Sequence, residues 1–104
     1  MTEINLPQNL NCIDDSAFFE CGGLKQITIP DSVEYLGSYA FFGCSELESV
    51  KLSANVNRLY GSTFYNCGKL SSFEAKNLKQ AFEADFHNTK IDIDSLIENG
   101  TEIK

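Results

Sequence analysis

The chain has 104 residues, of which 42% are hydrophobic and 22% are charged, and its formal net charge at pH 7 is −7. A chain of this length holds one domain with a modest core, and it contains no apolar run long enough to cross a membrane as a helix. Its 8 basic residues are scattered singly, whereas neutralising phosphates requires clustered lysine and arginine. The composition therefore argues against a membrane span and against direct binding to DNA or RNA.

The first residues, Met1-Thr2-Glu3-Ile4, include neither the basic nor the apolar region of a signal peptide. We therefore expect a cytoplasmic location if the sequence is complete. We expect a cell-surface or secreted location if it is a fragment of a longer protein.

A repeat of 23 residues begins at the first apolar residues of the chain. Segment 17–24 aligns without a gap with segments 40–47 and 63–70, so that aromatic pairs, cysteines and leucines share the same places. The apolar residues between these segments keep the same step: Ile4, Ile27, Val50 and Phe73; Leu6, Ile29, Leu52 and Ala75; Leu10, Val33 and Val56; Ile13, Leu36 and Leu59. Such a period predicts a solenoid, in which each repeat buries its apolar face against its neighbours.

Each repeat contains two extended segments and one turn. Residues 27–29 and 50–52 alternate apolar and polar side chains, which predicts a short strand. Pro30 ends the first of these strands, because proline cannot donate to a strand ladder. A second extended segment is expected over residues 33–36, and the Ala-Phe-aromatic-x-Cys run of residues 40–44 predicts a helical or 3-10 turn.

Stacked coils place the residues of one column above one another, about 4.8 Å apart. Phe18, Phe41 and Phe64 are therefore expected to form a buried aromatic column. We expect one domain over residues 1–104, with repeats at about 4–26, 27–49 and 50–72 and a divergent closing repeat at 73–104.

The repeat resembles the BspA-like (Treponema-type) leucine-rich repeats, over about residues 4–75. The family pattern is read here in Leu24-Lys25-Gln26-Ile27-Thr28-Ile29-Pro30-Asp31-Ser32-Val33-Glu34-Tyr35-Leu36-Gly37 and Ala40-Phe41-Phe42-Gly43-Cys44-Ser45-Glu46-Leu47. The resemblance implies a leucine-rich-repeat solenoid of the mainly β or α+β class, a right-handed coil of about four repeats with short parallel strands and helical or 3-10 turns. It also implies surface proteins linked to adhesion and protein binding, with no catalytic residues to carry over.

After Ala75 the repeat is expected to degrade. A helical spacing relates Leu78, Ala81, Phe82, Asp85 and Phe86, with Asn77 as the N-cap. A last strand is expected over Ile91, Ile93, Leu96 and Ile97. We interpret this tail as a divergent coil that covers the end of the solenoid, and a separate binding segment is the alternative.

The cysteines do not match a metal site. Cys21, Cys44 and Cys67 share one column without the paired spacing of structural zinc, so we expect them to be buried packing residues. Cys12 lies off this column and is expected to be exposed, where it can pair between chains or stay reduced.

No constellation of catalytic residues is apparent, so we expect neither an enzyme nor a cofactor. His87, the single histidine, has no partnering serine or cysteine and is expected to be half-buried in the phenylalanine column. Asp92, Asp94 and Glu98 lack the third acid and the glycine of a calcium-binding loop, so no metal site is predicted.

Two surfaces are candidates for binding a protein partner. The first carries aromatic side chains, which interfaces favour, although they can equally serve only to cover the turns; its residues are Phe19, Phe42, Tyr65, Tyr35, Tyr39 and Tyr60. The alternative is the outward face of the strands, with Gln26, Thr28, Ser49, Lys51, Ser72 and Glu74. In addition, Ile4 and Leu6 lie on an uncapped edge through which the chain can form a homo-oligomer.

These observations predict a non-enzymatic protein-interaction module. One alternative is a small acidic intracellular inhibitor or immunity-type protein, bound to a basic site on an enzyme or nucleic-acid-binding protein. Another is a structural spacer or adhesin fragment of a longer surface protein. Salt separates the first two, because contacts between exposed charges are screened.

Overall fold

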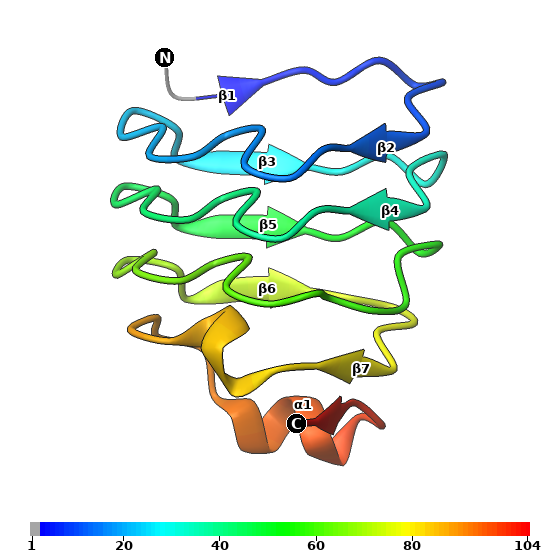
Figure 1. The fold of residues 1–104 in the computed structure, drawn as a ribbon, viewed down its shortest axis with the longest axis vertical. Helices are drawn as coiled ribbons and strands as arrows, with labels where there is room; N and C mark the ends of the chain where they lie inside the picture. Colours follow the sequence, from blue (N-terminus) through cyan, green and yellow to red (C-terminus); the bar gives the residue numbers. More distant parts are fainter. Residues whose placement is uncertain (1–2) are drawn as a thin grey trace.

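Short parallel strands build the wall of the molecule. The computed structural model describes residues 3–104 of the chain. β1 (Glu3–Ile4), β3 (Gln26–Thr28), β5 (Ser49–Lys51) and β6 (Ser72–Glu74) form one four-stranded sheet in the order β1-β3-β5-β6. Ile27 pairs with Ile4 on one side and with Val50 on the other, so each strand is displaced from the next by 23 residues. The coils therefore stack one above another, as Figure 1 shows.

The opposite wall is made of still shorter strands. β2 (Cys12–Ile13) pairs in parallel with β4 (Tyr35–Leu36), and β7 (Gln80–Ala81) pairs with β8 (Glu102–Ile103). A bridge between Arg58 and Gln80 links the second coil wall to β7. In Figure 1, β2, β4 and β7 run in the direction opposite to the four-stranded sheet, as the two sides of a flattened coil must.

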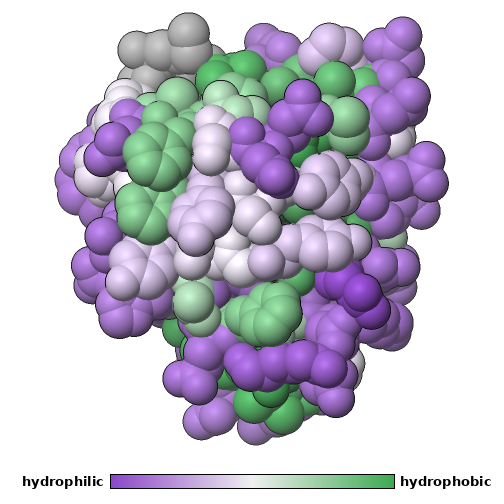
Figure 2. Space-filling view, in the orientation of Figure 1, coloured by the Kyte–Doolittle hydropathy of each residue, from purple (hydrophilic) through white to green (hydrophobic). Residues whose placement is uncertain are grey.

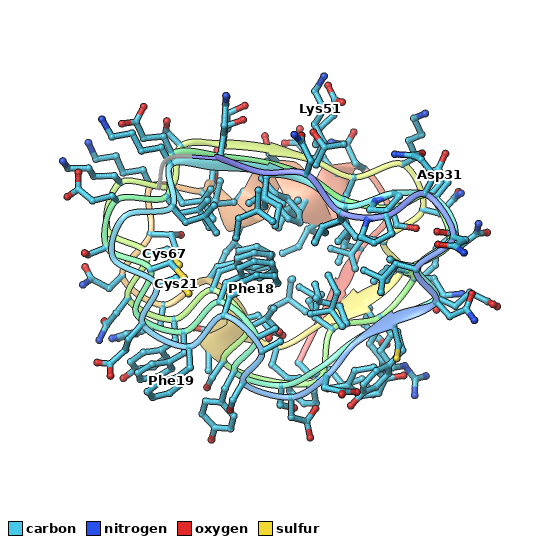
Figure 3. The ribbon with its side chains drawn as sticks, turned by 90° about the horizontal axis from the view of Figure 1, so that it is seen from above. Phe18, Phe19, Cys21, Asp31, Lys51 and Cys67 are labelled. Atoms are coloured by element: carbon cyan, nitrogen blue, oxygen red, sulfur yellow. The ribbon has the colours of Figure 1, made fainter. Side chains whose placement is uncertain are left out.

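The core lies between these two walls. Phe18, Phe41, Phe64 and Phe86 stack along the axis of the solenoid, with ring centroids 5.2, 5.5 and 5.9 Å apart. Figure 3, which looks along this axis, places Phe18 at the centre of the coil. The predicted column is therefore confirmed for its first three members, and each fully buried ring contributes roughly 1.5–3 kcal/mol of burial free energy.

Each coil contains one tight turn before its leucine, as predicted. The backbone N–H of each cysteine donates to the carbonyl of the phenylalanine three residues earlier: Cys21 to Phe18 at 3.2 Å, Cys44 to Phe41 at 3.2 Å and Cys67 to Phe64 at 3.1 Å. The residue between them takes a left-handed backbone conformation, with φ of 55° at Glu20, 72° at Gly43 and 63° at Asn66. Glycine and asparagine adopt this conformation at lower cost than other residues.

The fourth coil keeps the columns of the repeat, contrary to our expectation that the repeat degrades. It is one residue shorter, because Arg58 pairs with Gln80 and Phe64 stacks on Phe86, both 22 residues later. The N–H of Thr89 donates to the Phe86 carbonyl at 3.3 Å, as that of Cys67 does to Phe64. Thr89 therefore occupies the cysteine column, where the gapless repeat predicted Lys90.

The predicted helix in the tail is wrong. Residues 80–81 form β7, and the helical part is confined to a 3-10 turn at Glu83–Phe86. The Asn77 side chain does not act as an N-cap but donates to the carbonyl of Ala54 at 3.0 Å. The apolar spacing that suggested a helix instead reflects the inward positions of a fourth coil.

The predicted last strand is also wrong, because residues 93–98 form the helix α1 (Ile93–Glu98). The Asp92 carboxylate accepts a hydrogen bond from the N–H of Asp94 at 3.1 Å and caps its first turn. Leu96 is 9% exposed and packs on the core. α1 lies across the end of the solenoid (Figure 1), so the tail covers this end with a helix. No helix among residues 3–104 is long and apolar enough to span a bilayer.

Candidate interaction surfaces

The second aromatic column of the repeat forms a continuous stack on the outside of the turns. The rings of Phe19 and Phe42 lie 5.0 Å apart with planes 3° from parallel, and Phe42 and Tyr65 lie 5.0 Å apart at 5°. His87 extends the stack, with its ring 4.5 Å from that of Tyr65. Four aromatic side chains from four successive turns are thus fixed in one line.

His87 does not lie where the sequence analysis placed it. It is exposed rather than half-buried, and it continues the Tyr65 column rather than the phenylalanine column. The cause is the one-residue deletion in the fourth coil. The pair Phe86-His87 is the signal that was missed, because it repeats Phe64-Tyr65 once the shorter coil is allowed.

Three tyrosines widen this line of rings toward β2 and β4. Tyr39 packs against Phe42 with ring centroids 5.7 Å apart, and Tyr35 lies 5.3 Å from Tyr60. Much of this surface is open to solvent, since Phe19, Tyr39 and Tyr60 are 45%, 46% and 45% exposed. We call these seven residues the aromatic face: Phe19, Tyr35, Tyr39, Phe42, Tyr60, Tyr65 and His87. Figure 2 shows the apolar and aromatic side chains gathered on this side, with hydrophilic residues around them.

The ring geometry determines what a partner would meet. Stacking covers most of the faces of Phe42 and Tyr65, so their edges point outward. Ring edges are apolar and carry a partial positive charge, which favours contact with aliphatic groups or with the face of another ring. The aromatic face is therefore suited to an apolar contact with a partner protein.

One carboxylate is held in place beside these rings. Asp15 accepts hydrogen bonds from the Tyr35 hydroxyl at 2.8 Å and from the Ser38 N–H at 3.0 Å. The hydrogen bond to Asp15, together with partial desolvation, raises the pKa of Tyr35 above its ordinary value. Asp14 lies near enough to add to this effect. The N-terminal part of the aromatic face thus carries fixed negative charge.

The strand face, the alternative surface, contains a groove. The groove has a volume of about 730 Å³ and is lined by Gln26, Thr28, Ser49, Lys51 and Glu74 among others, whereas Ser72 does not line it. Its side chains are mostly polar, and Figure 3 shows Lys51 pointing away from the core on this side and Asp31 lying at its margin. It has none of the aromatic or arginine anchors that dominate binding energy in interfaces.

The cysteine column serves packing, as the sequence predicted. The Cys44 thiol donates to the Phe18 carbonyl at 3.1 Å, and the Cys67 thiol donates to the Phe41 carbonyl at 3.0 Å. Hydrogen bonding with Cys44, followed by burial, raises the pKa of Cys67, and burial raises the pKa of the half-buried Cys21. Cys12 is exposed, as expected. Among residues 3–104 there is no cluster of potential metal ligands.

A buried carboxylate lies behind the aromatic face and was not anticipated. Asp85 is fully buried and accepts hydrogen bonds from the N–H groups of Gly61, Thr63 and Phe82, at 3.0, 3.0 and 2.8 Å. These three bonds tie the turn of the third coil to that of the fourth. Asp85 therefore supports the part of the aromatic face that contains Tyr65 and His87.

The comparisons with known proteins agree with this architecture. The chain is similar to the crystal structure of a leucine-rich repeat protein from Treponema pallidum, with a TM-score of 0.84 and 28% sequence identity. The match covers 100% of this chain and 51% of that one, so the chain spans about half the length of the similar protein. No curated protein matches it. The sequence pattern of the BspA-type leucine-rich repeat region matches residues 1–104 with 6 copies. The chain therefore belongs to the BspA-type leucine-rich repeat family, a family of repeats that is generally non-enzymatic.

Proposed function

We propose that the chain is a protein-interaction module that binds its partner through the aromatic face. Membership of the leucine-rich repeat family supports a protein partner. The observation that carries the choice of surface is the unbroken stack of Phe19, Phe42, Tyr65 and His87, flanked by exposed tyrosines.

Rigidity makes this surface effective for binding. Each ring of the stack is held by its neighbours, and each turn is bonded to the next, for example through the Phe41 N–H to the Thr63 carbonyl at 2.9 Å. Little side-chain entropy is therefore lost when a partner docks, which raises affinity for a given contact area. Aromatic residues also dominate the energetic centres of known interfaces.

Partner capture with matched variants tests this proposal. The tagged chain is used to capture proteins from the cells that produce it, alongside a variant that combines Phe42→Ala with Tyr65→Ala. We expect the double variant to lose the partner, because truncating central aromatic side chains costs roughly 2 kcal/mol or more each. Circular dichroism of both proteins shows whether the variant remains folded.

A strand-face variant is the control. Ser49→Ala combined with Lys51→Ala removes side chains that line the groove, at positions that are half-buried and exposed. The proposal expects full capture by this variant. Loss of the partner with the strand-face variant and retention with the aromatic variant would move the binding site to the groove.

A second candidate function, an acidic inhibitor of a protein with a basic site, is favoured by the charge around the aromatic face. Asp14 and Asp15 lie beside Tyr35, and Glu20 follows Phe19 on the first turn. A salt step during elution distinguishes the two functions. An inhibitor held by charge is released as ionic strength rises, whereas a partner held on the rings is retained.

A further inference from the structure

The first coil of the solenoid has a neighbour on one side only. Its inward side chains, Ile4, Leu6, Leu10, Phe18 and Cys21, are half-buried and pack on the core. Their counterparts one repeat later are fully covered: Ile27, Ile29, Val33, Phe41 and Cys44 are at most 3% exposed. Figure 3 looks down on this end and shows the Phe18 ring lying open at its centre. The difference in burial marks an apolar surface that a further layer would cover.

The backbone at this end is also unpaired. β1 is the outer strand of the four-stranded sheet and pairs only with β3 among residues 3–104. An unpaired strand edge is a template for pairing with another strand. The end therefore offers both hydrogen-bonding groups and an apolar surface to one occupant.

The opposite end of the solenoid is closed. α1 and β8 lie across it in Figure 1, and Leu78, Ala81 and Phe86 beneath them are at most 5% exposed. The C-terminal end of one chain consequently cannot supply the missing coil to the open end of another. Head-to-tail stacking into a fibre is excluded by this arrangement.

We propose that the open end binds a second copy of the chain, head to head. A two-fold axis perpendicular to the strand face would place β1 antiparallel to β1 of the other copy, and would bring the two apolar ends together. Both copies use the same surface, so the contact closes after two chains. This interface is distinct from the aromatic face and does not depend on it.

The size of the end sets the strength of the dimer. The two shorter dimensions of the molecule are 28 and 20 Å, so two end faces bury on the order of 1,000 Å² in total, which is below the range of stable interfaces. The dimer is therefore weak and dissociates on dilution.

Charge weakens it further. Asp14, Asp15 and Glu20 are exposed on the first coil, and a head-to-head arrangement brings the acidic rims of two copies toward each other. Because salt screens this repulsion, the dimer becomes stronger as ionic strength rises. Attraction to a basic partner would show the opposite dependence on salt.

Sedimentation equilibrium of the chain from micromolar to millimolar concentration tests the proposal. A reducing agent is present, so that the exposed Cys12 thiol cannot link two chains. We expect the average mass to rise from that of the 11.6 kDa monomer toward twice that value, and to rise further at high salt. A constant monomer mass at every concentration, or growth beyond the dimer, would overturn the proposal.

Paired variants locate the contact. Leu6→Lys places a charge in the open end at a half-buried position, and we expect at least a tenfold weaker dimer. Ile97→Lys is the matched control, since Ile97 is 51% exposed on α1 at the closed end; it should dimerise as the unmodified chain does. The pair Phe42→Ala and Tyr65→Ala should also dimerise normally. Equal loss in the Ile97 or the aromatic variant would place the contact elsewhere, and the unmodified chain decides the question if Leu6→Lys does not fold.

Discussion

At the scale of single residues, equivalent chemical groups contribute very differently according to their place in the coil. Asp85 and Asp15 both accept hydrogen bonds from backbone N–H groups of a neighbouring coil. Asp85 is fully buried, whereas Asp15 is exposed and water can replace it. A buried donor that loses its acceptor costs more than an exposed one, so the two positions should differ in their sensitivity to substitution.

We expect Asp85→Ala to lower the free energy of unfolding by about 3 kcal/mol or more, because three N–H groups lose their acceptor in a buried place. Asp15→Ala is the control and should cost about 1 kcal/mol or less. Urea unfolding followed by circular dichroism measures both. Equal costs would mean that water reaches the Asp85 site.

The cysteines should differ in reactivity. The pKa of Cys67 is raised by hydrogen bonding with Cys44 and by burial, and only the thiolate reacts with a disulfide reagent. We expect the folded chain to expose one fast thiol, Cys12, and to release Cys44 and Cys67 only on unfolding. Reaction with a chromogenic disulfide, read thiol by thiol in a mass spectrometer, checks this order.

The same pKa shift predicts a dependence of stability on pH. The folded chain holds the Cys67 proton more tightly than the unfolded chain, whose thiol titrates near its ordinary value of 9.0. The stability from this difference is complete below that pH and is lost as the pH rises above it. Unfolding midpoints in urea from neutral pH upward should fall above this value, and they should fall less steeply in Cys67→Ala.

At the scale of elements, close contact between coils imposes particular residues on the turns. Gly37 follows β4 and lies against the backbone of Asp14 and Asp15 in the coil above, so a Cβ atom there would overlap both. Its N–H donates to the Ile13 carbonyl at 2.8 Å. Gly22, by contrast, has 4.0 Å between an added Cβ and the nearest atom, the Ser45 hydroxyl oxygen.

We therefore expect Gly37→Ala to destabilise the fold by roughly 2–4 kcal/mol, because two backbones must move apart. Gly22→Ala should change stability by less than about 0.5 kcal/mol. Thermal unfolding of the two variants beside the unmodified chain provides the comparison. A tolerated alanine at position 37 would show that the coils are less tightly packed than described.

The elements that the sequence predicted correctly are those that the repeat specifies several times over. The columns of Ile27 and Phe41 recur at one spacing, and the strands and turns follow from them. The tail was predicted poorly because a single missing residue near position 76 shifts every later column by one. α1 was missed because Ile91 and Ile93 alternate like a strand, while Asp92 starts a helix by capping it. The site was only partly predictable for the same reason, since His87 and Asp85 lie after the shift.

At the scale of the whole molecule, the solenoid is stable only if its ends are covered. α1 and β8 cover the last coil, and Leu96 and Thr101 are the buried residues that attach them. The Thr101 hydroxyl donates to the Leu78 carbonyl at 2.8 Å. Because each coil contacts only its neighbours, loss of the final layer exposes the core of the coil before it.

Deletion of residues 91–104 should therefore lower the unfolding temperature by at least about 10 °C, which corresponds to roughly 2 kcal/mol in a domain of this size. The exposed surface under the deleted helix should also bind a hydrophobic dye. Calorimetry and dye fluorescence measure the two effects. A truncated chain with unchanged stability would show that the tail is not a cap.

Hydrogen–deuterium exchange of the chain, alone and bound to its captured partner, tests the proposed binding surface most directly. Two sets of segments are compared: residues 16–20, 39–43 and 62–66 on the aromatic face, and residues 26–28, 49–51 and 72–74 on the strand face. We predict that the partner slows exchange in the first set and leaves the second unchanged. Protection confined to the strand segments would contradict the proposal and assign binding to the groove.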